Sequence, residues 1–422
     1  MNIKKYFTCI SIALLFSFSV FGQGTKRICK THENHLKMMS KDSSYAVRRV
    51  LHNRVISNRR GTNKKTTETL YTVPVVVHII HNGEPEGTGG NIPVSQVNSA
   101  IAALNLDFRS TNADTLTPSH PFYSLQADIN IEFCLANLTP EGLTTTGITR
   151  HNKGKSSWGT DDFDANVKPG TIWDITKYLN IWVTTIGIPD AGTLGYATPP
   201  EWPESTEVGV VIGPTYFGTT GTLDILFNKN RTVTHEVGHF FNLSHIWGDE
   251  TCGDDHVSDT PPQVGFNDSN CPSFPHNVGS SCSPGVNGEM FMNYMDYTRD
   301  DCMQLFTIGQ KDRMRAAIQL PDRIGLTTSN GCSNPNNTHN ISPLNIKIFP
   351  NPASNLVTIA SSSNLSLLGI NVYNLSGQLM NSTINIQEQE VSINTSSLPN
   401  GTYIISIITE AGTVNKNLVV IK

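Results

Sequence analysis

A five-residue segment at 235–239, with the sequence His-Glu-Val-Gly-His, constrains the fold of this chain more than any other feature. Residues four apart lie on one face of an α-helix, so His235 and His239 can present their imidazoles to one metal ion. Glu236 lies beside them, where it can polarise a water molecule on the metal without being a ligand. The alternative is a helix with incidental histidines, and chance produces this spacing in about one such chain in seventy. The segment therefore predicts a metal-binding helix over residues 231–243.

A third histidine, His245, follows this segment. Three protein ligands leave the fourth position of a tetrahedral zinc ion open, as catalytic sites require. The helix must end before His245 so that this side chain can turn back to the metal, and such an end usually needs a residue in the left-handed conformation. Asn242 stands there, and asparagine adopts that conformation more readily than most residues with a Cβ atom. We therefore predict a zinc site of His235, His239 and His245.

Residues 1–22 have the pattern of a secretory signal peptide, because Lys4 and Lys5 precede an apolar run over residues 10–21. The run is too short and too poorly flanked to span a bilayer, and no later stretch is apolar enough to do so. We therefore expect a secreted protein without a stable membrane span.

The next segment, residues 23–70, is polar and basic. Residues 26–65 hold twelve Lys or Arg and two acids, whereas the whole chain has 30 Lys or Arg against 35 Asp or Glu. Such an arm can bind nucleic acid or anionic lipid. Because the rest of this chain is acidic, docking onto that body is an equally plausible role. The pairs Arg48-Arg49 and Arg59-Arg60 are sites that proteases could cut. We interpret residues 23–70 as a pro-segment and expect no nucleic-acid partner; a disordered arm is the alternative.

The apolar pattern changes at residue 71. Strands are expected over 73–80, 129–135 and 179–186, and a helix over 95–108 with Ser95 as its N-cap. Together with the metal-binding helix, this order predicts an α/β (α+β) domain. We place it at residues 71–325, loop-rich after residue 244 and ending in an amphipathic stretch over 308–318.

The remaining chain divides into a linker and a second domain. Residues 326–343 are the expected linker, and from residue 333 they show no periodic apolar pattern. Short alternating runs with turn signals then fill residues 344–422, which predicts a β-sandwich of about 80 residues. Its strands are expected at 345–349, 356–359, 370–373, 391–393, 403–408 and 418–421.

The chain has eight cysteines, and removal of Cys9 with the signal peptide leaves seven. Disulfides are the default in an exported protein, and an odd count leaves at least one thiol unpaired. Four of the seven lie within residues 252–302, which indicates two disulfides in the loop-rich region. The seven are Cys29, Cys134, Cys252, Cys271, Cys282, Cys302 and Cys332.

Several segments resemble the metzincin clan of zinc proteases and, within it, the pappalysin family. They cover residues 71–325, and Asn242 is the visible departure, because the signature has Gly at this place. The resemblance implies a metzincin-like catalytic domain with an active-site helix and a Met-turn, and the activity of a zinc-dependent endopeptidase. The segments are the zinc-binding run with His245-Ile-Trp, then Asp259-Thr-Pro, Met292-Asn-Tyr-Met-Asp-Tyr297, Cys302 and Phe306-Thr-x-x-Gln-x-x-Arg-Met314.

The resemblance also implies roles for residues beyond the zinc ligands. Met295 would be the Met-turn residue, forming a hydrophobic floor beneath the zinc, and Tyr297 would be a phenol near the metal that stabilises the tetrahedral intermediate. The implied disulfides join Cys252 to Cys282 and Cys271 to Cys302.

A calcium site is implied in the acidic loop over residues 254–260. Its oxygen ligands would come from Asp254, Val257, Asp259 and Thr260. The alternative is an acidic loop that is only solvated.

The mechanism implied for such an enzyme uses Glu236 twice. Zinc lowers the pKa of its water, and Glu236 takes the proton and passes it to the leaving amine of a protein or peptide substrate. Several bacterial members of the family cleave before Arg or Lys through an Asp shortly after the Met-turn Tyr. Asp300 occupies the matching place, and a surface residue without this role is the alternative.

Cys29 lies within the basic pro-segment, in the sequence Lys-Arg-Ile-Cys-Lys. A thiolate is a good zinc ligand, so a cysteine on a removable arm can occupy the open metal position. This resembles the cysteine-switch latency of some metzincins. The alternative is a disulfide from Cys29 to Cys134 or Cys332.

The final domain, residues 344–422, resembles the type A C-terminal sorting domain of type IX secretion, an immunoglobulin-like β-sandwich. The resemblance implies that the type IX secretion machinery is a partner and that the protein crosses the outer membrane. It rests on Ile348-Phe-Pro-Asn-Pro-Ala-Ser354, Val372-Tyr-Asn-Leu-Ser-Gly-Gln378, Leu398-Pro-Asn-Gly-Thr-Tyr403 and the terminal Lys-Asn-Leu-Val-Val-Ile-Lys422.

Two rival functions remain open at this point. A secreted adhesin could keep a metalloprotease-like fold, but a pure binding protein has no need of Glu236. A zinc protease of another clan, with Glu as the third ligand, is the weaker rival because His245 and Met295 both fit the present scheme.

Overall fold

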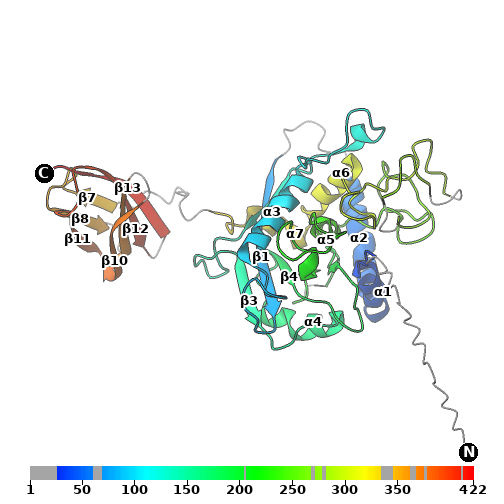
Figure 1. Cartoon of the computed structure of the whole chain (residues 1–422), viewed down its shortest axis with the longest axis horizontal. Coiled ribbons are helices and arrows are strands. Elements are labelled where there is room, and N and C mark those ends of the chain that lie inside the picture. The colour runs from blue at the N-terminus through cyan, green and yellow to red at the C-terminus, as the bar shows by residue number, and fades with distance from the viewer. Residues whose placement is uncertain are drawn as a thin grey trace, which may run out of the picture.

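A computed structural model describes residues 26–59, 69–203, 206–267, 271–277, 282–333, 346–361, 367–374, 378–409 and 412–422 (Figure 1). The expected signal peptide, residues 1–22, lies outside these ranges, as do most of the linker and the end of the expected pro-segment. Across the described ranges, no helix is long and apolar enough to cross a membrane.

The expected pro-segment contains two helices, α1 (Thr31–Lys41) and α2 (Ser43–Arg59). The chain turns between them at Asp42, whose carboxylate accepts hydrogen bonds from the Ser44 backbone N–H at 2.9 Å and from Arg48 at 2.8 Å. Acceptors at a helix start satisfy N–H groups that have no partner within the helix. The alternative of a disordered arm is therefore wrong for residues 31–59.

The core of the larger domain is a six-stranded sheet in the order β2-β1-β4-β6-β5, with β3 beside the second half of β1. All its pairings are parallel except that of β5 with β6, so β5 is an antiparallel edge strand. Residues 73–80 of β1 are buried without interruption, as expected for a parallel strand covered on both faces. The strands are β1 (Tyr71–His81), β2 (Ile131–Leu135), β3 (Ile148–Asn152), β4 (Leu179–Val183), β5 (Gly195–Ala197) and β6 (Val210–Ile212).

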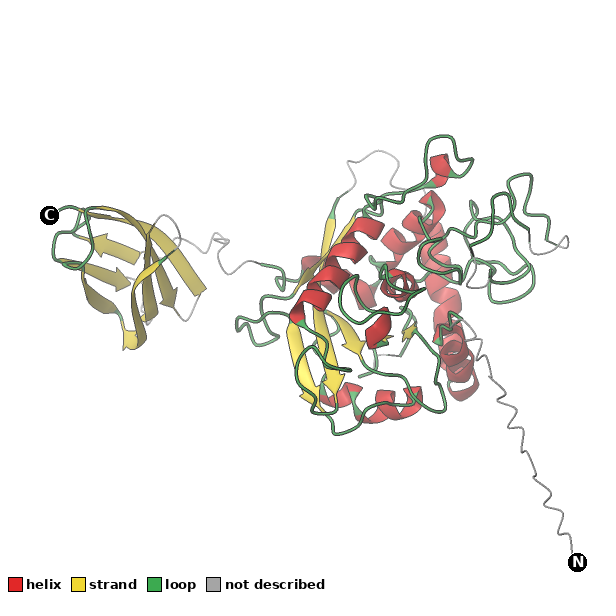
Figure 2. Ribbon diagram, viewed as in Figure 1, coloured by secondary structure: helices red, strands yellow, loops and turns green. Residues whose placement is uncertain are grey.

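Helices pack around this sheet (Figure 2). Helix α3 packs against both β2 and α5, and α5 also lies against β5 and β6. The helices are α3 (Val94–Phe108), α4 (Thr160–Asn166), α5 (Arg231–Phe240), α6 (Ile308–Ala317) and α7 (Pro321–Thr328), with 3-10 turns η1 (Tyr123–Leu125), η2 (Lys168–Gly170) and η3 (Pro214–Tyr216).

Two expected helix ends differ from the structure. Helix α3 begins at Val94 behind Pro93 and has no side-chain cap, so the prediction of Ser95 as N-cap is wrong. Proline suits this place because its fixed φ suits a helix start and it lacks the N–H that would need a partner. Helix α5 ends at Phe240 rather than at residue 243, because the backbone N–H of Leu243 turns back to the Gly238 carbonyl at 3.0 Å.

Three disulfides stabilise the larger domain. The structure joins Cys252 to Cys282 and Cys271 to Cys302 within the loop-rich region, and Cys134 to Cys332 across 198 residues. Cys29 is a buried free thiol. A disulfide from Cys29 to Cys134 or Cys332 is therefore excluded.

The C-terminal part consists of strands in two sheets, β10-β9-β12-β13 and β11-β8-β7. Side chains from both sheets, such as Ile359, Ile370 and Ile405, form one apolar core. Strand β10 has no counterpart among the expected strands, because its polar sequence lacks a clear alternation. The strands are β7 (Ile346–Phe349), β8 (Leu356–Ser361), β9 (Leu367–Asn374), β10 (Leu379–Glu388), β11 (Glu390–Asn394), β12 (Gly401–Thr409) and β13 (Gly412–Val420).

Candidate active site

Helix α5 carries His235, Glu236 and His239, and every residue of the helix is buried. Asp107 of α3 holds the helix from behind, since it accepts a hydrogen bond from Thr234 at 2.6 Å and forms an ion pair with Arg231. A carboxylate buried this deeply needs such partners to offset the loss of its hydration. The helix is therefore fixed against α3 before any metal binds.

The imidazoles of His235, His239 and His245 converge on one point. The Nε2 atom of His239 lies 3.1 Å from the Nε2 atoms of both His235 and His245. On the far side of each ring, the Nδ1 atom has its own acceptor. The Nδ1 atom of His235 lies 2.7 Å from the Tyr294 carbonyl, and that of His239 lies 2.7 Å from the Leu243 carbonyl. The Nδ1 atom of His245 contacts the Asp249 carboxylate.

These contacts fit a cation at the centre. Burial and the neighbouring imidazoles hold the pKa of His235 well below its ordinary value and lower that of His239 to about 3, so both rings are neutral. With the protons on Nδ1, the facing Nε2 atoms are acceptors and cannot hydrogen-bond to one another. Tetrahedral zinc with Zn–N bonds of about 2.0–2.1 Å holds ligand nitrogens about 3.3 Å apart. The three rings thus match a zinc site in donor type and spacing.

The turn that brings His245 to this point is centred on Asn242, whose φ is 74°. This is the left-handed conformation predicted for it. The ring of His245 stacks on Trp247, with centroids 4.4 Å apart and planes 4° from parallel. Stacking and the bond to Asp249 together fix the orientation of this ligand, as partners of metal-bound histidines commonly do.

Met295 lies directly below the zinc-binding helix and is fully buried. A Cβ atom built on Gly238 would lie 2.7 Å from the Met295 sulfur, so only glycine leaves room for this contact. Tyr297 lies beside the site, with its ring centroid 4.9 Å from that of His245. Burial raises the pKa of Tyr297, so its phenol keeps a proton that it can donate.

Glu236 is 1% exposed, and burial raises the pKa of its carboxyl to about 7. Its Oε2 atom accepts a hydrogen bond from Thr31 at 3.0 Å and lies 3.5 Å from the Cys29 sulfur. A Cβ atom on Gly195 would come within 3.0 Å of the Glu236 side chain, so β5 runs directly against this carboxylate. A carboxyl with its pKa near neutrality is suited to both accept and return a proton.

The expected pro-segment covers this site along β5. The Leu194 backbone N–H donates to the Ile28 carbonyl at 2.9 Å, and the Lys30 N–H donates to the Gly195 carbonyl at 3.2 Å. The Ala197 N–H donates to the Thr31 hydroxyl at 2.9 Å. The segment therefore occupies the cleft as an added strand, over the position that a substrate would need.

The Cys29 sulfur lies within 4.8 Å of one ring nitrogen of each of the three histidines. Burial and the Glu236 carboxylate raise the pKa of this thiol well above its ordinary value. A cation among the imidazoles would reverse this effect, because a metal deprotonates a coordinating thiol. The Cys29 sulfur thus lies near enough to the three histidines to reach a cation held among them.

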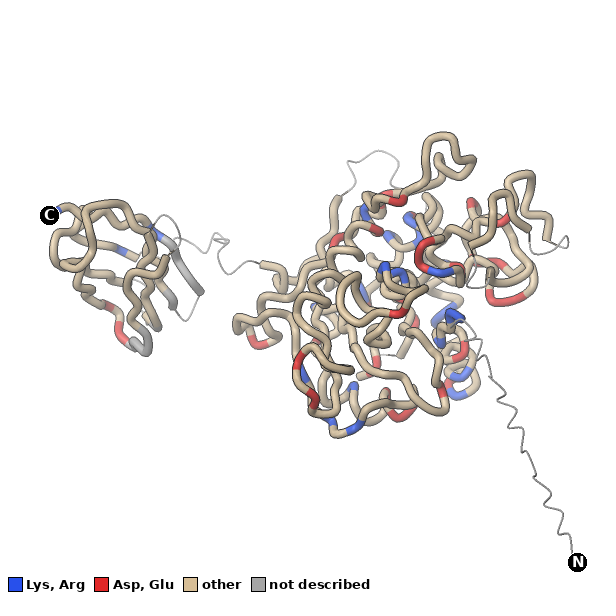
Figure 3. The backbone as a smooth tube through the Cα atoms, viewed as in Figure 1, with Lys and Arg blue, Asp and Glu red and all other residues tan. Residues whose placement is uncertain are grey.

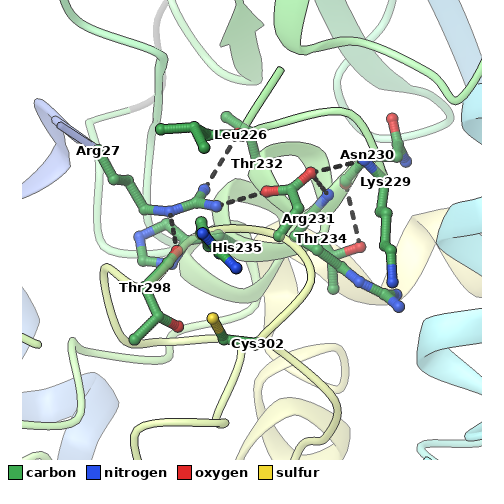
Figure 4. A network of polar contacts seen from close by, with 12 residues as sticks. Arg27, Leu226, Lys229, Asn230, Arg231, Thr232, Thr234, His235, Thr298 and Cys302 are labelled. Atoms are coloured by element: carbon green, nitrogen blue, oxygen red, sulfur yellow. Dashed lines mark hydrogen bonds and ion pairs between the residues drawn. The ribbon is translucent and has the colours of Figure 1, made fainter. Parts of the chain in front are cut away.

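The Arg27 side chain is buried against Asp300, Thr232, Thr298 and Phe227, a set of residues that we call the Asp300 pocket; Figure 4 shows the network of polar contacts that Arg27 joins. The Arg27 guanidinium donates to Asp300 Oδ1 at 2.7 Å, to the Thr232 hydroxyl at 3.0 Å and to the Thr298 carbonyl at 3.2 Å, and it lies 4.9 Å from the Phe227 ring. Both charged side chains are 1% exposed. The alternative of a surface residue is therefore wrong for Asp300.

Asp300 also contacts the start of the zinc-binding helix. Its Oδ2 atom accepts hydrogen bonds from the backbone N–H groups of Lys229 at 2.8 Å and Arg231 at 3.2 Å. The N-cap residue of α5, Asn230, makes no capping bond with its own side chain. One carboxylate therefore serves both the pocket and the helix.

The expected calcium ligands make separate hydrogen bonds in the loop over residues 254–260. Asp259 accepts from Thr307 at 2.7 Å and from the Gly309 N–H at 2.8 Å, and Thr260 donates to the Val257 carbonyl at 2.8 Å. Asp254 accepts from the His256 N–H at 2.7 Å. These oxygens already hold the loop by internal hydrogen bonds.

Several residues of this site are not marked by the sequence. Arg27, Thr31 and Asp249 belong to no motif, and each reaches the site through contacts that only the fold creates. For Arg27, the sequence indicates only that it belongs to a basic segment that precedes an acidic body.

The fold and the three-histidine site define the chain as a zinc metalloendopeptidase. A family model described as "Pregnancy-associated plasma protein-A", peptidase M43, matches residues 161–319, and one described as "Secretion system C-terminal sorting domain" matches residues 347–422. The chain belongs to the M43 family, the pappalysins, as its sequence predicted.

Relatives and solved structures agree with this assignment. An extracellular metalloprotease of Arthroderma otae is 30% identical over 254 residues, which are 59% of this chain and 78% of that protein. A promirolysin mutant of Tannerella forsythia is 37% identical with a TM-score of 0.63, over 72% of this chain and 97% of that one. Mature mirolysin of Tannerella forsythia in complex with a cleaved peptide is 41% identical with a TM-score of 0.56, over 62% and 97%. The sorting domain and these relatives confirm the prediction of a secreted protein.

Proposed function

We propose that the chain is the zymogen of an endopeptidase in which His235, His239 and His245 bind zinc and Glu236 is the general base. The observation that carries this is the convergence of three imidazoles beside the buried Glu236 carboxyl, with Nε2 of His239 3.1 Å from Nε2 of both His235 and His245. When bound, the ion supplies an acidified water and a Lewis acid for the scissile carbonyl. Glu236 accepts the proton of the water and then donates it to the leaving amine.

Two further side chains support this reaction. Tyr297 would donate a hydrogen bond to the carbonyl oxygen as negative charge develops on it, since its buried phenol stays protonated. Met295 would be the Met-turn residue, because its sulfur contacts the helix turn between the two histidines of α5. Its contribution is a fixed floor that holds the ligands in place.

Asp300 would select a basic residue, Arg or Lys, directly after the scissile bond. The support is the Arg27 guanidinium, which occupies the pocket with acceptors for three of its nitrogens and an aromatic wall. Such a pocket favours binding of a planar cation. A neutral side chain in it would leave the polar groups of the pocket unpaired.

Residues 23–70 would be a pro-segment that enforces latency, with Cys29 occupying the open metal position. Its support is the location of the Cys29 sulfur among the three histidines, together with the strand-like contacts along β5. We further propose the catalytic domain at 71–325, the linker at 326–343, and the sorting domain at 344–422 as an immunoglobulin-like sandwich handled by the type IX machinery.

We also propose that calcium binds the loop over residues 254–260 through Asp254, Val257, Asp259 and Thr260. The support is the acidic sequence of the loop and its buried carboxyl, Asp255, which accepts from the Thr260 hydroxyl at 2.8 Å and whose pKa is raised to about 7 by burial. Calcium prefers such carboxylate and carbonyl donors. Removal of calcium by a selective chelator would then lower the melting temperature without removing zinc.

The test is cleavage of a proteome-derived peptide mixture by the activated protein, with and without a zinc chelator. We expect chelator-sensitive cleavage with Arg or Lys directly after the cleaved bonds. Absence of any chelator-sensitive cleavage would instead favour the rival function of an adhesin.

A further inference from the structure

We propose that the cleft has a second cation-binding subsite, in which Glu201, held by Asn242, binds a basic side chain of the substrate on the N-terminal side of the scissile bond. The inference rests on the proposed function, because it assigns a second specificity pocket to the same cleft. It differs from the Asp300 pocket in its residues and in the part of the substrate that it contacts.

The position of Glu201 follows from the path of the pro-segment along β5. The Ile28 carbonyl bonds to the Leu194 N–H, the Lys30 N–H to the Gly195 carbonyl, and the Thr31 hydroxyl to the Ala197 N–H. Cys29 is bridged to Gly195 in parallel, so the segment follows this strand from its start to its end. Arg27 and the Asp300 pocket lie before this run, and Glu201 lies beyond its other end. Glu236 is between them. If Asp300 takes the residue after the scissile bond, Glu201 faces residues before it.

Asn242 holds the Glu201 carboxylate in place. Its side-chain amide donates to Glu201 Oε2 at 3.1 Å, and Glu201 is 2% exposed. Asn242 is also the residue at which this chain departs from the glycine of the metzincin signature. Its backbone conformation, with φ at 74°, is one that glycine adopts without strain. The departure therefore adds a side chain whose amide positions an acidic group.

The pro-segment supplies the present partner of this acid. Arg49 of α2 places its Nε atom 3.9 Å from Glu201 Oε1, and the neighbouring Arg48 donates to the Glu201 carbonyl at 3.3 Å. Within the described residues, Arg49 is the one basic side chain within ion-pair distance of Glu201. Removal of the pro-segment leaves the buried Glu201 carboxylate without its one ion-pair partner among the described residues, which is unfavourable unless another cation or water takes that place.

The surroundings of Glu201 open onto the catalytic groups. A small cavity of about 40 Å³ lies between the pro-segment and the body, lined by Thr31, Arg49, Glu201, His239, Asn242 and Asp249 among others. Thr31, which contacts Glu236, and His239 both line this cavity, so it lies next to the catalytic groups. Asp249 adds a second carboxylate, which lies 3.1 Å from His32 of the pro-segment.

Charge therefore has the same arrangement at both ends of the covered cleft. Arg27 contacts Asp300 at one end, while Arg49 faces Glu201 at the other. Lys and Arg positions recur along α1 and α2, and Asp and Glu positions are spread over the rest of the larger domain (Figure 3). A substrate that displaces the pro-segment gains the most binding free energy if it places a cation at each end of the cleft.

A purely structural role is the competing explanation, because two buried arginines lie nearby. Arg313 donates to the Asn242 carbonyl at 2.7 Å, and Arg323 donates to the Thr198 carbonyl at 3.4 Å and lies 4.2 Å from the Phe240 ring. Glu201 could serve to balance their charge. That role would change the stability and the rate for all substrates alike, whereas a subsite changes the preference between substrates.

The experiment measures kcat/KM of the activated enzyme on peptides with a constant Arg after the scissile bond. The peptides carry Arg, Gln or Glu at a single position two to four residues before that bond. The readout is the ratio of the Arg to the Gln peptide within one variant, in which any general loss of activity cancels. We expect a ratio of about tenfold for the wild type at the favoured position, which corresponds to one pairing of about 1.4 kcal/mol.

Glu201→Gln should bring this ratio close to one, and Asn242→Gly should lower it while keeping the carboxylate and the helix end. Asp300→Asn is the matched control, since it alters the other pocket and should leave the ratio unchanged. A wild-type ratio near one at every position, or an unchanged ratio in Glu201→Gln, would overturn the subsite. Both results require active enzyme, so they differ from the failure of the proposed function, in which no peptide is cleaved.

Discussion

Replacement of Asp300 by Asn or by Ala would separate two roles of one carboxylate. Its Oδ1 atom receives the Arg27 guanidinium at 2.7 Å, and its Oδ2 atom accepts from the backbone of Lys229 and Arg231 at the start of α5. Asparagine keeps an amide oxygen for the helix and loses the negative charge. Alanine loses both the charge and the cap.

The magnitudes follow from the burial of these contacts. A buried charge pair that loses one partner typically costs about 2–5 kcal/mol, which is about 30-fold to several-thousand-fold in kcat/KM for a peptide with Arg after the scissile bond. Loss of a helix N-cap costs about 0.5–2 kcal/mol of stability. Both variants should therefore lose the preference for Arg, whereas only Asp300→Ala should also lose thermal stability and zinc affinity.

The assay combines kcat/KM on matched peptides, with Arg or Gln after the scissile bond, with melting temperature and zinc titration. The interpretation is refuted if Asp300→Asn keeps its preference for Arg. The role of Asp300 at the start of α5 is refuted if Asp300→Asn and Asp300→Ala show the same melting temperature and zinc affinity.

Three further predictions follow from the contacts of the pro-segment and the helix. Cys29→Ala should speed autoactivation of the purified proform, followed by electrophoresis over time; an unchanged rate would count against a metal-blocking thiol. Acidification should weaken pro-segment docking, because burial and Arg49 lower the pKa of His35 to about 3 in the docked state. The stabilisation of the docked pro-segment by neutral His35 is complete above the ordinary histidine pKa of about 6.5 and is lost as the pH falls towards 3. Calorimetric titration of the catalytic part with the separate pro-segment should show this loss of affinity, and a His35→Gln segment should lose much of the pH dependence. Equal pH profiles of the two segments would count against His35. Gly238→Ala should cost about 1–3 kcal/mol, because its Cβ meets the Met295 sulfur at 2.7 Å; an unchanged melting temperature would contradict that contact.

The parts of the fold that the sequence predicted are those with a strong local pattern. The continuous apolar run of β1 and the zinc-binding segment of α5 place a strand and a helix without reference to anything distant. Strand β5 has three residues and no alternation to detect, although it lies directly against Glu236. Its position depends on pairing with β6, which no local pattern encodes.

The candidate site likewise contains residues that a local sequence pattern marks and residues that only the fold brings together. The ligands His235, His239 and His245 follow from spacing on one helix and the turn after it. The contact of Arg27 with Asp300 joins residues 273 apart, and that of Asn242 with Glu201 joins two loops. Such contacts are products of the fold, so the sequence could indicate a basic segment and an acidic body but not the pairs between them.

The pro-segment helices show the limit of compositional reasoning. Helix α2 is polar overall, and its buried residue Ile56 packs on Ala316, Ala317 and Leu320 of the catalytic part. The helix is therefore stabilised by a partner surface rather than by its own apolar pattern. A polar sequence alone could not distinguish it from a disordered arm.

The central claim is that Glu236 is the general base of a zinc site formed by three histidines. The most direct measurement compares activated wild type with Glu236→Ala for bound zinc and for the rate of peptide hydrolysis. We predict one zinc per molecule in both proteins and a rate at least about 10²–10⁴-fold lower in the variant. A variant that binds zinc and cleaves peptides at the wild-type rate would contradict the claim.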